Sequence, residues 1–161
     1  MIGFVLSIIT FNLIALKFNK KLKGNHIAHI WMFTIAFQTS FDAYINYKFQ
    51  GYWYFTKAVD WWELPATTIL VPPVNIIFLN FYPLNKSLSK QIKYITFWVF
   101  GILAYEILAL LPEPIGYFNY GWWTIWHSVI IDPILLVILL MYYKWILKLE
   151  RKPTDISEEK I

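Results

Sequence analysis

The sequence predicts an all-α fold, an integral membrane bundle of five transmembrane helices, and three observations lead to this prediction. The 161 residues are 58% hydrophobic and 15% charged, whereas soluble domains carry about 25% charged residues. Five apolar windows each approach the roughly 20 residues that a helix needs to cross the hydrocarbon core of a membrane. The basic residues gather between these windows, as they do in cytoplasmic loops. A disordered chain and a water-soluble globule are therefore both disfavoured.

The five windows leave room only for short loops and a polar tail. Their approximate bounds are 1–16, 27–47, 64–81, 92–111 and 122–143, so that residues 1–149 form one transmembrane domain. The second window is the weakest, because Gln38, Ser40 and Asp42 dilute its apolar residues. In the first window the lysines follow the apolar run, which favours an uncleaved anchor over a secretion signal.

The distribution of basic residues predicts the orientation of the bundle. Twelve of the fourteen lie in three groups, within 17–23, 86–93 and 144–160. Five spans place all three groups on one side of the membrane and leave Lys48 and Lys57 on the other. Since cytoplasmic loops are enriched in lysine and arginine, we expect the N-terminus outside and the C-terminus in the cytoplasm, with a polar tail at 150–161. The net charge of +4 then reports topology, and no binding to nucleic acid is expected.

Aromatic residues mark the expected outer surface of the membrane. The segment 49–63, FQGYWYFTKAVDWWE, combines Gly51 with mixed polarity, which argues against a span. Tryptophan and tyrosine rings are amphipathic and favour the headgroup region, so we expect this segment to lie along the outer interface in contact with lipids. The expected interfacial anchors are Trp61, Trp62, Trp122 and Trp123.

Four ionisable side chains fall inside the predicted spans, where an ionisable group is a functional-site hypothesis by default. Asp42, Glu106 and His127 come from three different helices, each about five or six residues below the outer end at 1.5 Å of rise per residue. Asp132 lies deeper, near the middle of the membrane. We expect the first three to line the mouth of an outward-facing polar pocket and Asp132 to line its floor.

A break in helical backbone marks the floor of the same pocket. Pro72 and Pro73 have no backbone N–H, so the carbonyls of Thr68 and Ile69 lose their helical donors. Inside a membrane such a break occurs where protein or water supplies other partners. Asn75 follows the break and is the fifth predicted binding residue. Discontinuous helices with polar groups near the midplane are typical of transporter sites.

Simpler roles compete with binding for these residues. Asp42 lies close enough to the outer end of its window to reach lipid headgroups. His127 is able to fix helix packing through a hydrogen bond to Glu106 or to a backbone carbonyl. The chain has no cysteine, no glycine-rich phosphate loop and no HExxH motif, so we predict no catalytic residue, no cofactor and no metal site.

Three functions remain open. The leading interpretation is a small polytopic membrane protein that binds or conducts a small solute or ion in the polar pocket, with proton coupling as one form of it. The second is an accessory or structural subunit whose polar residues join helices through hydrogen bonds of about 1 kcal/mol each. The third is a membrane-embedded acid–base enzyme acting on a lipid or isoprenoid, with Glu106 and His127 as the acid–base pair.

Three segments carry a resemblance to a known group of proteins: ELPATTILVPPVNIIFLNFYP, YITFWVFGILAYEILA and GYFNYGWWTIWHSVIIDPILL. Through them, residues 60–145 resemble a family of small uncharacterised multispanning membrane proteins of endospore-forming bacteria. The resemblance implies a multi-pass protein of the bacterial cytoplasmic membrane and adds weight to the region of Glu106 and His127, but it implies no activity. Because five spans enclose little volume, we expect a homo-oligomer or a larger membrane complex if anything passes through.

Overall fold

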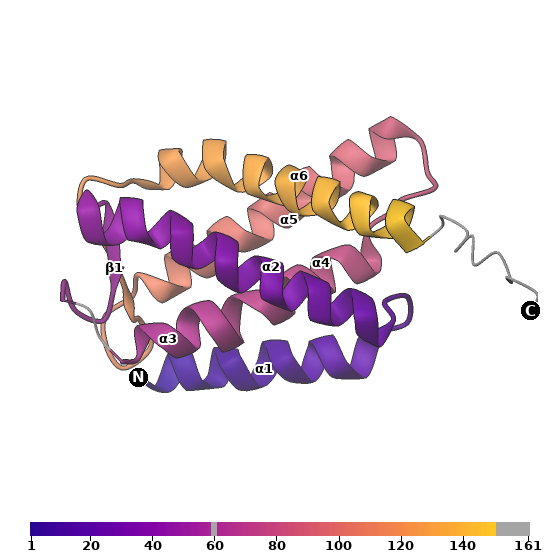
Figure 1. The fold of residues 1–161 in the computed structure, drawn as a ribbon. Helices are drawn as coiled ribbons and strands as arrows, with labels where there is room; N and C mark the ends of the chain where they lie inside the picture. The colour runs from indigo at the N-terminus through magenta and orange to yellow at the C-terminus, as the bar shows by residue number, and fades with distance from the viewer. Residues whose placement is uncertain (59–60, 151–161) are drawn as a thin grey trace, which may run out of the picture.

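The computed structural model describes residues 1–58 and 61–150, and within this part the chain is mostly helical (Figure 1). The helices are α1 (Ile2–Phe18), α2 (Gly24–Asp42), α3 (Glu63–Pro65), α4 (Val71–Phe81), α5 (Leu88–Ala109) and α6 (Ile125–Glu150). A π-helical segment η1 (Ala43–Lys48) extends α2, and a second, η2 (Ala66–Leu70), joins α3 to α4 in one rod. Two short strands, β1 (Tyr52–Tyr54) and β2 (Phe118–Tyr120), lie between helices.

The helical rods run back and forth across the molecule, so that its N-terminus and the end of α6 lie at opposite ends (Figure 1). We call the end that holds β1, β2 and residues 109–124 the sheet end. The opposite end holds the loops 19–23 and 82–87 and the last turns of α6, and we call it the lysine end.

Polar contacts join three segments at the lysine end. The side-chain oxygen of Asn80, at the end of α4, accepts hydrogen bonds from the backbone N–H groups of Lys20 (2.9 Å) and Lys21 (3.0 Å). Nε2 of His26 lies 2.7 Å from Oε2 of Glu150, which connects the start of α2 to the end of α6. The described members of all three basic groups therefore belong to the same end of the bundle.

The sheet end differs from the prediction, because it contains a pair of strands where the sequence indicated only an interfacial segment and a short loop. β1 and β2 pair antiparallel, with Tyr52 opposite Tyr120 and Tyr54 opposite Phe118. Aromatic residues favour strands. The crossing next to the sheet is tight, since a Cβ on Gly121 would lie 2.1 Å from the backbone oxygen of Gln50. The chain is thus mostly helical, as the sequence predicted, and the two three-residue strands are an addition that the sequence did not predict.

Side chains of neighbouring helices donate hydrogen bonds to the carbonyls that the two prolines leave free, as the sequence led us to expect. Nε1 of Trp31, on α2, donates a hydrogen bond of 2.9 Å to the carbonyl of Thr68. Nδ2 of Asn12, on α1, donates one of 3.0 Å to the carbonyl of Ile69. The rod α3–η2–α4 is therefore fixed from two sides at the level where its own backbone bonding is interrupted.

Three helical rods in the described part are long and apolar enough to cross a membrane, which indicates a membrane protein. They are Glu63–Phe81, Leu88–Ala109 and Ile125–Glu150. Helix α1 is apolar but shorter, with 17 residues. Helix α2, which carries Gln38 and Asp42, is not among the three. Beyond Glu150 the predicted polar tail lies outside the described residues.

Helix α5 is much less buried than the rod Glu63–Phe81. In the apolar window of Leu88–Ala109 only 6% of the residues are buried, compared with 56% in that of Glu63–Phe81. A buried cluster around Ile30, Phe78 and Leu139 packs α2, α4 and α6 together at the lysine end. Helix α5 packs Tyr94, Trp98 and Ile102 against this core. The cavity described below lies beside α5, since Gly101, Ile102 and Glu106 line it.

Candidate binding cavity

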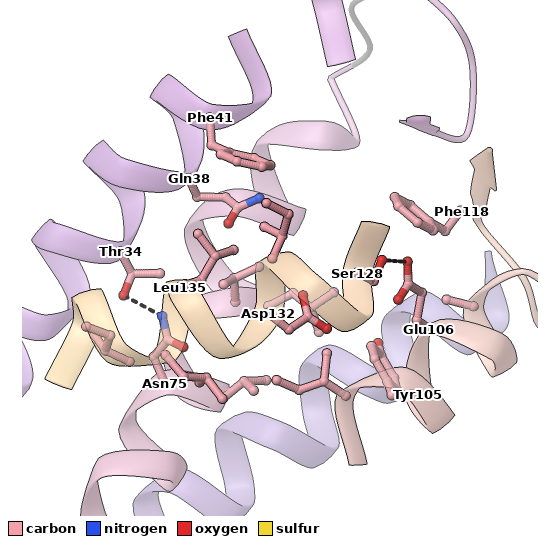
Figure 2. A pocket seen from close by; sticks show the side chains of 18 of the residues that line it. Thr34, Gln38, Phe41, Asn75, Tyr105, Glu106, Phe118, Ser128, Asp132 and Leu135 are labelled. Atoms are coloured by element: carbon pink, nitrogen blue, oxygen red, sulfur yellow. Dashed lines mark hydrogen bonds between the residues drawn. The ribbon is translucent and has the colours of Figure 1, made fainter. Parts of the chain in front are cut away.

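The main cavity has a volume of about 460 Å³ and lies between α2, α4, α5 and α6. Most of the residues that line it are aromatic or aliphatic, and its walls include Phe33, Phe37, Val74, Ile102 and Leu135. Polar side chains enter the lining from all four helices (Figure 2). They are Thr34, Gln38, Asn75, Glu106, Ser128 and Asp132.

Glu106 is held at the sheet end of the cavity by neutral donors. Its Oε1 accepts hydrogen bonds from the hydroxyl of Tyr120 (2.7 Å) and from that of Ser128 (2.7 Å). Ser128 in turn accepts one of 2.9 Å from Nε1 of Trp123. Burial, followed by the bond to Glu106, raises the pKa of the Tyr120 hydroxyl above its ordinary value, so this hydroxyl remains a donor.

Asp132 lies one turn beyond Ser128 on α6 and shares the cavity with Glu106 (Figure 2). Its Oδ2 is buried and has no hydrogen-bond partner, and the same is true of Nε1 of Trp98 on α5. Among the described residues these are the two buried side-chain polar atoms without a partner, and both residues line the cavity. A buried polar group left unpaired costs about 1–3 kcal/mol, so each such atom calls for an explanation.

Asn75 lies in the wall of the same cavity. Its Nδ2 donates a hydrogen bond of 3.0 Å to Oγ1 of Thr34, which joins α4 to α2 (Figure 2). The structure thus places Asn75, Glu106 and Asp132 around one space, from three different helices.

Asp42 lies outside this cavity, although the sequence placed it at the same mouth as Glu106. It is 2% exposed and accepts a hydrogen bond of 2.5 Å from the hydroxyl of Tyr52, with further bonds from Gln38. It lines a second cavity of about 300 Å³ together with Glu63. Helical depth can be counted along a sequence, but the direction of a side chain around the helix cannot, and Asp42 lines a different cavity from Glu106.

Glu63 is a buried acidic residue that the sequence analysis missed. It is 3% exposed, and its carboxylate accepts hydrogen bonds from Nδ2 of Asn46 and from the hydroxyl of Tyr47 (2.8 Å). Its place at the edge of an apolar window made it look like an interfacial residue. The spacing of Glu63 and Thr67, one helical turn apart before the proline break, is the signal that could have pointed to it.

His127, which the sequence placed at the mouth of the pocket, lines neither cavity. No hydrogen bond joins it to Glu106, the residue with which the third interpretation pairs it. Its Nδ1 accepts a hydrogen bond of 3.0 Å from the backbone N–H of Thr124. Its ring lies 5.4 Å from that of Trp122 and 5.1 Å from that of Trp123. The reason is local, because a free N–H before the first turn of a helix needs an acceptor and His127 supplies it.

Three of the four expected anchors are at the surface, and one is not. Trp61, Trp62 and Trp122 are 85%, 47% and 51% exposed, whereas Trp123 is 6% exposed. Trp123 packs against Tyr52 and donates to Ser128, so it belongs to the closed sheet end of the main cavity.

The charge of the main cavity is one-sided. Glu106 and Asp132 contribute carboxyl groups, while none of the residues that line it is a lysine, arginine or histidine. Such a cavity favours a cation or a proton over an anion. In the described part of the chain no group of three or more histidine, cysteine or acidic side chains is arranged to hold a metal ion.

Comparison of the chain with protein-family models, with curated proteins and with solved structures gives no match. The functional interpretation therefore depends on the chemistry of the cavity.

Proposed function

We propose that the chain is a multi-pass membrane protein that binds a small cationic ligand in the main cavity. The observation that carries this proposal is that the two unpartnered buried atoms, Oδ2 of Asp132 and Nε1 of Trp98, belong to the walls of one cavity. One is an acceptor and the other a donor. A ligand with an N–H donor and an acceptor oxygen would satisfy both, and the cost of leaving these two buried atoms unpaired would then be offset on binding.

The positive charge of the proposed ligand follows from the lining. Two carboxyl groups without a basic neighbour attract an ammonium group, and the attraction is stronger at low dielectric than in water. An ammonium group also carries the N–H donors that Oδ2 of Asp132 lacks. An anion would meet two acidic groups and find no charged partner among the lining residues.

We further propose five spans, with the N-terminus outside and the C-terminus in the cytoplasm. The described members of the three basic groups, which lie at the lysine end, support this orientation. Hydrogen bonds from α2 to the rod α3–η2–α4 support its position inside the bundle, since Thr34 accepts one from Asn75 and Trp31 donates one to the carbonyl of Thr68. The resemblance to multispanning proteins of endospore-forming bacteria supports a place in a bacterial cytoplasmic membrane.

Binding is favoured over conduction by the closed sheet end. The ring of Tyr52 lies 5.1 Å from that of Phe118 and 5.5 Å from that of Trp123, and Tyr52 and Trp123 are almost fully buried. These rings form the wall of the cavity at the sheet end. A continuous path across the bundle would have to open this aromatic layer.

A structural role for the polar residues is the second candidate, and the hydrogen bonds between helices favour it. Ser128 joins α6 to α5 through Glu106, and Asn75 joins α4 to α2. This role does not account for Asp132 Oδ2 and Trp98 Nε1, which form no hydrogen bond to another helix. Binding explains these two atoms as well, so we place it first.

The test compares two probes that differ only in the charge of the head group, decylammonium and decanoate. We expect decylammonium, but not decanoate, to raise the unfolding temperature of the protein in lipid nanodiscs, because a ligand that binds only the folded state stabilises it. The variant Asp132→Asn should lose this difference, and Glu150→Gln, a change at the lysine end, should keep it. Equal stabilisation by decanoate, or an undiminished effect in Asp132→Asn, would contradict the proposal.

A further inference from the structure

We infer that the ligand is a single-chain amphiphilic amine dissolved in the membrane, and that it reaches the cavity sideways, through a gap in the wall at Gly101 of α5. This inference rests on the proposed function, because it names the ligand class and the route for the same cavity. It has four supports, which are the exposed wall of α5, the closed ends of the cavity, its size and the placement of its polar groups.

The wall on α5 is thin in the middle of the helix. Phe97 is 75% exposed and Gly101 is exposed, yet both residues line the cavity. A Cβ built on Gly101 would meet no other atom within 4 Å. A residue that lies both on the outer surface and in the cavity lining marks a place where only one layer of atoms separates them. This place is in the middle of an apolar helix, at the level of the hydrocarbon core.

Both ends of the cavity are closed by packed side chains. At the sheet end the rings of Tyr52, Phe118 and Trp123 are in contact, and the hydroxyl of Tyr52 is bonded to Asp42. Toward the lysine end the lining ends at Leu139, next to which Leu140 and Tyr143 are buried in the core. A ligand from either aqueous side would have to separate these groups, whereas on the side that faces lipid the wall is one layer thick at Gly101, with open space beside it.

The size of the cavity fits one alkyl chain with a small head group. At roughly 30 Å³ for each atom of water size, 460 Å³ holds about fifteen non-hydrogen atoms. That is too little for a lipid with two chains. The aliphatic and aromatic walls, which include Phe33, Val74 and Leu135, suit the chain.

The placement of the polar groups suits an amphiphile that extends along the bundle. Glu106 and Asp132 lie toward the sheet end, where the head group of a lipid-soluble amine would find both carboxyl groups. Trp98 precedes Glu106 by eight residues on the same helix, about 12 Å further from the sheet end. Its free Nε1 then faces the chain of the ligand, where an ether, ester or hydroxyl oxygen would accept the hydrogen bond.

The test measures whether lipid chains or water have access to the side chain of Trp98. The protein is labelled with 5-fluorotryptophan, placed in lipid nanodiscs and observed by ¹⁹F NMR, and the signal of Trp98 is assigned with Trp98→Phe. Relaxation of this signal by lipids with a nitroxide on the acyl chain is compared with relaxation by a water-soluble gadolinium chelate. The same measurement is made on Gly101→Leu, which fills the gap, and on Ala104→Leu, a matched change at an exposed residue of α5 that does not line the cavity.

We expect the chain-labelled lipid to relax the Trp98 signal several-fold more strongly than the chelate. Gly101→Leu should reduce the effect of the lipid several-fold, Ala104→Leu should leave it unchanged, and added decylammonium should reduce it in the wild type. Stronger relaxation by the chelate, or equal effects in Gly101→Leu and the wild type, would overturn the sideways route. If Gly101→Leu does not fold, the comparison of lipid and chelate in the wild type still decides the question. A failure here with the charge preference intact would remove the route and leave the binding proposal standing.

Discussion

The hydroxyl of Tyr52 donates a hydrogen bond of 2.5 Å to Oδ1 of Asp42, and this contact ties strand β1 to the end of α2. Both residues are almost fully buried. The sequence places them ten residues apart, on either side of a turn that contains Gly51. The bond therefore fixes the direction in which the chain leaves the second helix and begins the sheet.

Removing this hydroxyl tests its contribution to stability. Tyr52→Phe leaves Asp42 with hydrogen bonds from Gln38 and should lower the free energy of unfolding by about 1.5–3 kcal/mol, the usual range for a hydrogen bond to a charged group. The measurement is denaturant unfolding in mild detergent. Tyr44→Phe, at a residue of η1 that is 59% exposed, is the control and should change stability little. Equal losses in the two variants would contradict the role of the bond.

Ionisation of the same hydroxyl should lower the stability of the fold at alkaline pH. Burial, followed by the charge of Asp42, raises the pKa of Tyr52 well above its ordinary value of 10.0. A raised pKa contributes stability that is complete below the ordinary pKa and is lost as the pH rises toward the folded value. Between pH 9 and pH 11, at about one unit on either side of that ordinary value, the wild type should lose more stability than Tyr52→Phe. Parallel pH profiles for the two proteins would be inconsistent with this assignment.

The hydrogen bond from Trp31 to the carbonyl before the two prolines gives a third prediction. Trp31→Phe removes the donor to the carbonyl of Thr68 and keeps most of the ring volume, so it should cost about 1–3 kcal/mol of unfolding free energy. Trp126→Phe makes the same change at a residue that is 73% exposed and should cost much less. Thermal unfolding of both variants in nanodiscs is the measurement. A neutral Trp31→Phe would mean that the carbonyl finds another donor.

Trp123 and Trp98 both line the main cavity, and replacing each in turn distinguishes a structural hydrogen bond from a donor reserved for a ligand. Nε1 of Trp123 donates to Ser128, whereas Nε1 of Trp98 has no partner. In protein without added amine, Trp123→Phe should therefore lower the free energy of unfolding by about 1 kcal/mol more than Trp98→Phe, because only the first removes a hydrogen bond. If Trp98→Phe is the more destabilising change, Trp98 has a structural partner and the reason to expect a ligand acceptor disappears.

The sequence predicted the positions of the helices closely and the strands not at all. All five apolar windows coincide with helical segments, because hydrophobic runs and charged ends are local signals. The pairing of Tyr52 with Tyr120 depends on residues far apart in the chain, which come together only when the helices bring both segments to one end. No pattern within a short stretch of sequence predicts such a pairing of distant strands.

For the candidate site, the sequence indicated which groups lie inside the spans but not which way they face. Depth follows from counting residues, and Glu106 and Asp132 do share a cavity. Rotation about the helix axis separates Asp42 from them, and the local contact with Thr124 holds His127 away from Glu106. Trp98 was missed, although Trp98, Ile102 and Glu106 recur every four residues and therefore share one face of α5.

The most direct test of the account is to find where a bound amine lies. A decylamine that carries a diazirine at the end of its chain would be activated by light in nanodiscs that contain the protein, and the labelled residues identified by peptide mass spectrometry. The account predicts labels on residues that line the cavity in α5 and α6, with loss of these labels when excess decylammonium is added or when Asp132 is changed to Asn. Labels confined to lipid-facing residues such as Phe100 and Ile107, unchanged by excess decylammonium, would contradict it.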